Sequence, residues 1–365
     1  MRQLSICIAA LASLAAFAAF APLSAEFEPG DSVNLDSCAG DTTRLGVSRI
    51  VEIDAADGVN VGGDTRGAQR LLKDGEVVLT FDDGPTRTVT KPILKALADQ
   101  CTKATFFMVG QMALSDPAMV REVAAAGHTV GSHTWSHKNL KAISLAKSEH
   151  EIEASISAVS QAKGTPVAPL FRFPYLNSTK ETEAYLKSRN IAAIWIDVDS
   201  KDYLSRNPKV VQQRILSQLA TTKKGIILLH DIHASTAAML PGLLNELHER
   251  GFKVVHFVPK GQTETIASYD EAARKAFAAK AARQAKSKAA SRPAIEPDET
   301  DLAAVTAVPG TRPQPNRDMK ISTKPSIVEG LAGEGPAAPA RNKKAVKPKE
   351  PESIWPSFFP DPKQL

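Results

Sequence analysis

Cysteine is scarce in this chain, with 3 residues among 365. Cys7 lies in an apolar N-terminal run, which leaves Cys38 and Cys101 for the rest of the protein. A pair so far apart in sequence argues against a metal site built on thiolates. In an oxidising compartment the two residues are a disulfide candidate that would tie the N-terminal arm to the body of the protein. Two buried free thiols are the alternative.

Long apolar runs are also rare. Residues 6–20 approach the length that spans a bilayer, and no second run does. This run follows Arg2 and precedes the small-residue sequence Leu23-Ser24-Ala25, a pattern typical of a secretory signal peptide over residues 1–25. An uncleaved membrane anchor is the alternative. The pattern predicts an exported protein, in the periplasm, the cell envelope or the extracellular medium.

Excess charge is missing from most of the chain. Of 45 Lys and Arg and 40 Asp and Glu, 18 and 13 lie from Lys260 onward, which leaves 27 of each upstream. This neutral body predicts no nucleic-acid partner. Residues 260–365 also hold 13 of the 24 prolines and are expected to be a low-complexity tail. Its basic residues, or its aromatic cluster at Trp355, Phe358 and Phe359, could contact the cell envelope.

The middle of the chain alternates apolar runs with helical patterns. Strands are expected at residues 76–81, 104–109, 128–132, 169–173, 191–198, 225–229 and 252–257. Helices are expected at residues 91–99, 118–126, 144–162, 179–189, 208–221 and 236–250. This order predicts an α/β fold, a distorted barrel of about seven parallel strands over residues 76–259, with residues 26–75 as an N-terminal arm that packs on it. In such barrels the chemistry lies where strands end and loops begin.

Polar clusters follow several of the predicted strands. The run "EVVLTFDDGP" ends in two adjacent carboxylates, Asp82 and Asp83, which should repel each other unless something compensates. Turn chemistry alone would also explain a strand that ends in Asp-Asp-Gly-Pro. However, His133 and His137 of "SHTWSH" and His230 of "LLHD" fall at the same mouth of the predicted barrel.

Two imidazoles and one carboxylate with open positions form the ligand set of a catalytic metal. These ligand types favour zinc, with cobalt, nickel and manganese as alternatives. A bound divalent cation would let both aspartates stay charged. The second aspartate would then be free to act as a base on metal-bound water.

Five motifs, in order, carry a resemblance: "TFDDGP", "SHTWSH", "RFPY", "DSKDY" and "LLHD". They resemble the motifs of the polysaccharide deacetylase family, carbohydrate esterase family 4, also called the NodB homology domain. The resemblance runs from about Glu76 to Phe257. It implies a distorted (β/α) barrel and metal-dependent hydrolysis of N-acetyl groups from N-acetylglucosamine-containing polysaccharide, either peptidoglycan or chitooligosaccharide.

The resemblance also implies a role for each motif residue. Asp82 would be the general base and Arg172 its partner, while Asp83, His133 and His137 would hold the metal. An acetylated glycan would be the substrate.

On the opposite side of the site, the resemblance implies His230 as the general acid, paired with Asp202. The backbone N–H of Tyr175 would stabilise the oxyanion, and Leu229 would line the acetyl pocket. Tyr203 stands where tryptophan is usual in the family and alters one wall of that pocket. The loop after Tyr175 is also unusual, because leucine follows where glycine is frequent.

Other assignments stay open at this point. An O-acetyl esterase, or a non-catalytic envelope-binding protein that keeps the fold, are alternative functions. His128 is expected to pack beneath the site rather than bind the metal. His233 could contact substrate or cap a helix, and Asp231 could be a turn residue or a partner of Arg172.

Overall fold

The computed structural model describes residues 38, 41–63 and 70–290. The predicted signal peptide over residues 1–25 and the aromatic cluster around Trp355 lie outside the described residues. The chain divides into two units, residues 1–270 and 271–365. The fold described here belongs to the first unit.

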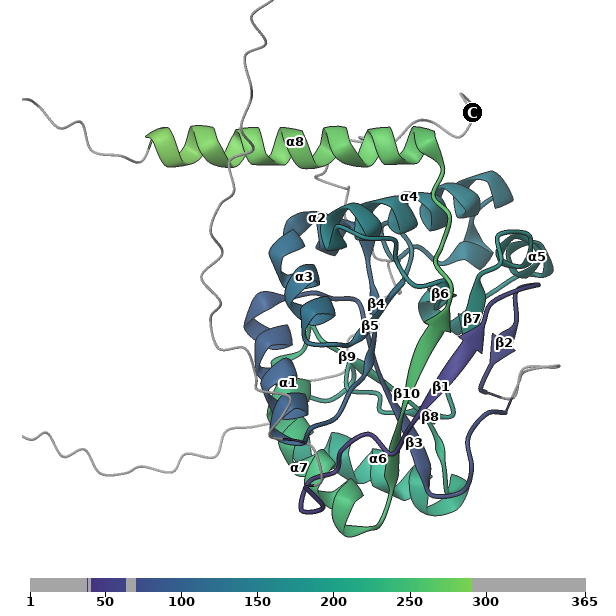
Figure 1. Ribbon diagram of the computed structural model, residues 1–365, viewed down its shortest axis with the longest axis vertical. Coiled ribbons are helices and arrows are strands. Elements are labelled where there is room, and N and C mark those ends of the chain that lie inside the picture. Colours follow the sequence, from purple (N-terminus) through teal and green to yellow (C-terminus); the bar gives the residue numbers. More distant parts are fainter. Residues whose placement is uncertain (1–37, 39–40, 64–69, 291–365) are drawn as a thin grey trace, which may run out of the picture. The chain divides into compact units, whose positions relative to one another are not determined.

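A ten-stranded sheet forms the centre of the described part of this unit, and each pair of neighbouring strands runs parallel (Figure 1). The strands are β1 (Arg49–Asp54), β2 (Asn60–Val61), β3 (Glu76–Asp82), β4 (Thr105–Met108), β5 (Thr129–Ser132), β6 (Leu170–Phe171), β7 (Ala192–Ile194), β8 (Val198–Asp199), β9 (Gly225–His230) and β10 (Lys253–Lys260). The fold is therefore α/β with a parallel sheet, as predicted.

Strand β3 lies between several neighbours. Its first residues pair with β10 and its last residues pair with β4, while β9 pairs along its length. All seven residues of β3 are buried, because a parallel strand covered on both faces must be apolar on both. Asp82 is the last of them, so the sheet itself places this carboxylate at its C-terminal edge.

Helices cover the outside of the sheet (Figure 1). They are α1 (Arg87–Asp99), α2 (Gly110–Ser115), α3 (Pro117–Ala125), α4 (Leu145–Lys163), α5 (Lys180–Ser188), α6 (Pro208–Thr222) and α7 (Ala234–Glu249), with short 3₁₀ turns η2 (Leu140–Ala142) and η3 (Pro174–Leu176). Neighbours pack in the order α6, α7, α1, α3, α4 and α5. This ring leaves the inward faces of the strands to form the main core, which includes Val78, Phe107, Leu170, Ile226 and Phe257.

The helix ends follow local sequence signals. Pro208 opens α6 after Asn207, whose side chain accepts a hydrogen bond from the Lys209 amide. Thr179 and Thr182 form a reciprocal capping box at the start of α5. Gly164 ends α4 with φ of 84°, in the left-handed region that glycine adopts without steric cost. These signals explain why the helix predictions differ from the structure by only a few residues at each end.

The N-terminal arm is part of the sheet. β1 pairs with β10 and β2 pairs with β7, so the arm supplies two strands that the sequence did not predict. Residues 191–198, expected as one strand, form β7 and the start of β8 instead. A disulfide joins Cys38 to Cys101, with a Cα–Cα distance of 5.6 Å.

Helix α8 (Ala267–Ala290) follows β10 in the sequence and is rich in Ala and Lys. Among the described residues, none of the helices combines the length and hydropathy needed to cross a bilayer.

Candidate metal centre and active site

Three potential ligands converge at the C-terminal edge of the sheet. Asp83 directly follows β3, and His133 and His137 follow β5. The Asp83 Oδ1 atom lies 3.4 Å from His133 Nε2 and 3.2 Å from His137 Nε2. One potential ligand atom from each of the three residues lies within 4.8 Å of the other two. The sheet therefore brings together the three residues that the sequence singled out as metal ligands.

The hydrogen-bond pattern shows that this cluster suits a cation. His133 Nδ1 lies 2.7 Å from the Arg172 carbonyl oxygen, which can only accept, so this nitrogen carries the proton. The Nε2 lone pair of His133 is then aimed at Asp83, whose buried Oδ1 makes no hydrogen bond. Lone pairs that face one another without a proton between them fit a bound metal ion. The described residues therefore fit a divalent cation.

Ionisation supports the same conclusion. Burial, and then the nearby His133, lower the pKa of His137 to about 4, so its imidazole is neutral at neutral pH. Burial acts to raise the pKa of Asp83, but contact with His133 and the fields of His137 and His230 outweigh it and hold that pKa below its usual range. At neutral pH the cluster therefore offers the ionised carboxylate of Asp83 and the neutral nitrogen of His137 to a cation.

Backbone geometry and buried polar contacts hold the ligand loop after β5. Thr134 and His137 adopt φ of 64° and 57°, a region that residues other than glycine rarely occupy. The Thr134 carbonyl accepts a hydrogen bond from the Gly110 amide at the start of α2. The Glu151 side chain of α4 accepts two hydrogen bonds from Ser136, from its amide and its hydroxyl, both at 2.7 Å. Strained backbone of this kind persists only where its surroundings fix it, and it gathers at functional sites.

Asp82 and Arg172 form a buried pair beside the ligands. Asp82 is 2% exposed, and its Oδ1 accepts a hydrogen bond from Arg172 Nη1 at 2.9 Å. The same nitrogen donates to Thr80 Oγ1 at 2.7 Å, and the guanidinium carbon lies 4.4 Å from the centre of the Phe107 ring. Burial lowers the pKa of Arg172, although Asp82 counters this. The pair keeps a second carboxylate next to Asp83, because the arginine compensates its charge.

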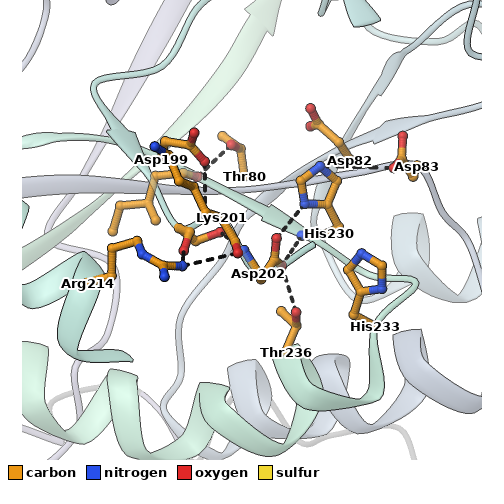
Figure 2. Close-up of polar contacts among 12 residues, drawn as sticks. Thr80, Asp82, Asp83, Asp199, Lys201, Asp202, Arg214, His230, His233 and Thr236 are labelled. Carbon is orange, nitrogen blue, oxygen red and sulfur yellow. Dashed lines mark hydrogen bonds and ion pairs between the residues drawn. The ribbon is translucent and has the colours of Figure 1, made fainter. Parts of the chain in front are cut away.

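His230 and Asp202 lie on the other side of the cluster (Figure 2). The His230 Nδ1 atom is 2.6 Å from Asp202 Oδ1, and its Nε2 is 4.0 Å from Asp83 Oδ2. The other oxygen of Asp202 accepts hydrogen bonds from the His230 amide and from the Thr236 hydroxyl of α7. Burial acts to lower the pKa of His230, but the contact with Asp202, and then its charge, raise it to about 9. His230 is therefore an imidazolium at neutral pH and holds a proton that it can donate.

Two tyrosines lie at the solvent-exposed rim of this arrangement. Tyr175, at φ of 58°, is 63% exposed, and its ring centroid lies 4.8 Å from that of His137. Tyr203 is 47% exposed and meets the His230 ring edge-on at 5.6 Å.

Leu229 does not share the site. It is fully buried on β9, and successive side chains of a strand point to opposite faces, so it lies on the face opposite His230. Register supports this, because His230 is paired with Asp82 whereas Leu229 is paired with the buried Phe81. The expectation that Leu229 lines an acetyl pocket is therefore wrong. Leu228 is the leucine on the same face as His230.

Asp231 and His128 form hydrogen bonds with residues other than Arg172 and the three potential ligands. Asp231 is 1% exposed and accepts a hydrogen bond from the Thr90 hydroxyl at 2.7 Å, rather than one from Arg172. A methyl group added at Gly84 would come within 2.2 Å of the Asp231 carboxylate, so only glycine allows the Asp-Asp-Gly-Pro turn to lie against this side chain. Burial raises the pKa of Asp231 to about 7. His128 lies at the opposite end of the strands, where its Nδ1 accepts a hydrogen bond from the Ala104 amide.

Several contributing residues were missed from the sequence. Thr80 contacts Arg172, Thr236 contacts Asp202, and Glu151 supports the ligand loop. Thr80 had a usable signal, because it lies two positions before Asp82 on the same face of an otherwise apolar strand. Thr236 and Glu151 lie on helices far along the chain from their partners and give no local signal.

Comparison with known proteins agrees with this geometry. A family model for polysaccharide deacetylase matches residues 70–194, which include Asp82, Asp83, His133 and His137. A chitooligosaccharide deacetylase of Sinorhizobium fredii is 30% identical over 198 residues, which cover 50% of this chain and 90% of that protein. A peptidoglycan-N-acetylglucosamine deacetylase of Listeria monocytogenes, PgdA, is 34% identical over 179 residues, 49% of this chain and 37% of that protein.

A solved structure adds to this likeness. The Bdellovibrio bacteriovorus peptidoglycan deacetylase Bd3279 superimposes with a TM-score of 0.54 at 31% identity, over 61% of each chain. This protein belongs to the polysaccharide deacetylase family, as its five motifs indicated. The chain spans only 37% of the length of the Listeria relative.

Proposed function

We propose that this protein is a metal-dependent hydrolase that removes N-acetyl groups from N-acetylglucosamine-containing polysaccharide, either peptidoglycan or chitin-like oligomers. The observation that carries the proposal is one cluster of metal ligands with Asp82 and Arg172 on one side and His230 and Asp202 on the other. The names of the Listeria and Sinorhizobium relatives support this substrate class.

Asp83, His133 and His137 would hold the cation, and their mixed nitrogen and oxygen donors favour zinc. When bound, it would supply Lewis-acid chemistry, polarising the acetyl carbonyl and lowering the pKa of adjacent water. All further steps use side chains and backbone groups of the chain itself.

Asp82 takes a proton from the attacking water. Arg172 donates a hydrogen bond to its Oδ1 at 2.9 Å and so orients this buried carboxylate, leaving its Oδ2 available to accept the proton. As the water oxygen bonds to the carbonyl carbon, negative charge gathers on the carbonyl oxygen. We assign the Tyr175 backbone N–H to its stabilisation.

His230 then gives its proton to the amide nitrogen. The carbon–nitrogen bond breaks, acetate leaves, and the sugar keeps a free amine. An amine leaves poorly unless it is protonated, so an acid held charged by Asp202 is what the reaction requires. A positioned acid of this kind is worth about 10²–10⁴ in rate.

The same proposal places the protein outside the cytoplasm. The Cys38–Cys101 disulfide supports an oxidising compartment, and an exported protein would meet the polymers that its relatives are named for.

The test is mass spectrometry of chitotetraose and of peptidoglycan fragments after incubation with the purified protein. We expect loss of acetyl groups, which EDTA abolishes and added zinc or cobalt restores. D83N should lose both metal binding and activity, whereas D99N, a change to an exposed aspartate on α1, should lose neither. Zinc-loaded protein that releases acetate from neither substrate would refute the proposal.

A further inference from the structure

A second polar pair, Arg206 and His233, lies next to the proposed general acid His230 and has no role in the steps proposed above. His233, immediately before α7, has its ring 5.9 Å from the His230 ring, and Figure 2 shows the two side by side. Its Nδ1 lies 2.9 Å from Nη1 of Arg206, in the segment between β8 and α6. An arginine can only donate, so His233 Nδ1 is the acceptor and its ring proton is on Nε2.

This pair therefore offers only hydrogen-bond donors to a ligand. Arg206 uses one of its five N–H groups on His233 and is exposed, so the remaining edge of its planar fork is available. Burial lowers the pKa of His233, which keeps the ring neutral with Nε2–H as a donor. Two neighbouring donors, one of them cationic, match the two oxygens of a carboxylate.

The charge around the pair has the same sign. Lys201, Arg206 and Lys209 are exposed, and none of them forms an ion pair with a described residue. The acids of the same segment are already engaged: Asp202 is turned inward to His230, and Asp199 accepts from the Lys201 amide. The side of the site that carries His230 thus has a surplus of positive charge facing solvent, although the body of the protein as a whole is neutral.

An apolar surface adjoins these donors. Tyr203 is 47% exposed and Leu204 is 69% exposed, and both precede Arg206 in the same segment. Such side chains can pack on the apolar face of a sugar ring while polar neighbours bind its substituents.

We propose that Arg206 and His233 form a subsite for a carboxylate carried by the glycan, so that the enzyme prefers an acidic amino-sugar polymer over a neutral one. This inference rests on the proposed deacetylase function and names its substrate more closely. The carboxylate would lie on a substituent near the acetamido group that His230 serves, as in a polymer whose alternate sugars carry a lactic acid ether.

The test compares three substrates: a peptidoglycan-derived oligosaccharide with free carboxylates, its methyl ester, and chitotetraose. We expect wild-type protein to prefer the free acid to its ester. R206Q should reduce kcat/KM about tenfold more for the free acid than for chitotetraose, which is the value of one charge-assisted hydrogen bond. R206K should restore part of the difference, because it returns the charge without the fork. H233Q should also reduce the preference, and since the His233 side chain makes no helix-capping hydrogen bond, this change should not unfold α7.

R250Q is the matched control, because Arg250 is an exposed arginine just beyond the far end of α7. R250Q should change kcat/KM for none of the three substrates. Equal losses for all three substrates in R206Q, or no wild-type preference for the acid over its ester, would overturn the subsite.

Calorimetric binding of the same oligosaccharides to the zinc-loaded protein separates the two proposals. If nothing is hydrolysed but the acid binds more tightly than its ester, and R206Q removes the difference, the subsite stands and the deacetylase function fails. If acetate is released but neither rate nor binding depends on the carboxylate, the function stands and the subsite fails.

Discussion

Replacing Asp202 with asparagine should change the pH dependence of catalysis rather than simply abolish it. Asparagine keeps the size of the side chain and one oxygen for hydrogen bonding, but removes the charge beside His230. That charge is what overcomes burial and raises the pKa of His230 to about 9. Without it, this pKa should fall toward the ordinary histidine value of about 6.5, because burial then opposes only the smaller effects of Asp82 and Asp83.

The size of the effect follows from the proton occupancy of the acid. At pH 8 a group with a pKa of about 9 is roughly 90% protonated, and one with a pKa of about 6.5 is roughly 3% protonated. The loss of kcat/KM should therefore reach about 30-fold at pH 8 and only about 1.3-fold at pH 6 from this cause. The alkaline limb of the pH profile should move down by about 2.5 pH units, the difference between the two pKa values.

The assay is acetate release from chitotetraose by the zinc-loaded protein between pH 5.5 and 9.5. D199N is the matched control, since Asp199 lies in the same segment but contacts the Lys201 amide rather than His230. A D202N profile that is lowered equally at pH 6 and pH 8, with its alkaline limb unmoved, would show that His230 is not the acid whose proton Asp202 retains.

Two further predictions concern stability. Burial lowers the pKa of His128 to about 3 and that of His256 to about 4, so both are neutral when folded, whereas in the unfolded chain they take up protons below about pH 6.5. Stability should therefore fall as the pH drops from 6.5 toward 3–4, by about 1.4 kcal/mol per histidine at pH 5.5, and urea unfolding at pH 7 and 5.5 should show this fall shrink in H128Q. A double change of Cys38 and Cys101 to serine should lower the free energy of unfolding by about 3–4 kcal/mol, because the bridge spans 63 positions, while activity at 25 °C should persist. Equal stability at pH 7 and 5.5 would contradict the histidine prediction, and equal stability with and without the bridge would contradict the disulfide prediction.

The sequence predicted the buried strands well and the edge strands poorly. β3, β4 and β9 are covered on both faces, so each reads as a continuous apolar run. β1 reads Arg-Ile-Val-Glu-Ile-Asp and exposes every second residue from Ile50 onward, and β2 has only two residues. Such segments form strands because a neighbour is available for pairing, and single-sequence patterns do not record that neighbour.

The boundary between β7 and β8 illustrates the same limit. Asp197 lies between them, and its two carboxylate oxygens accept hydrogen bonds from the Gly63 and Ile226 amides. Between β7 and β8, the Asp197 side chain thus accepts the backbone hydrogen bonds that a neighbouring strand would otherwise accept. Nothing in the run from 191 to 198 indicates that its partners lie more than a hundred residues away on one side and nearly thirty on the other.

Within the site, the motifs predicted which residues meet but not always which way they face. The position of Asp83, His133 and His137 followed from strand ends that share one edge of the sheet. Leu229 faces away from His230 because side chains alternate along β9, and a motif by itself does not show which face a residue takes. The sequence does not predict the contact between Arg206 and His233, since they are 27 positions apart and belong to no periodic pattern.

The central position of β3 in the sheet should determine how this protein unfolds. An element hydrogen-bonded on both edges and wholly covered has no local route to solvent, so its amide hydrogens should exchange only when the entire unit opens. The two aspartates at its end are thereby attached to the slowest-exchanging part of the chain. Fraying at the molecular periphery should leave their spacing intact, and catalysis should disappear on heating together with the global transition rather than ahead of it.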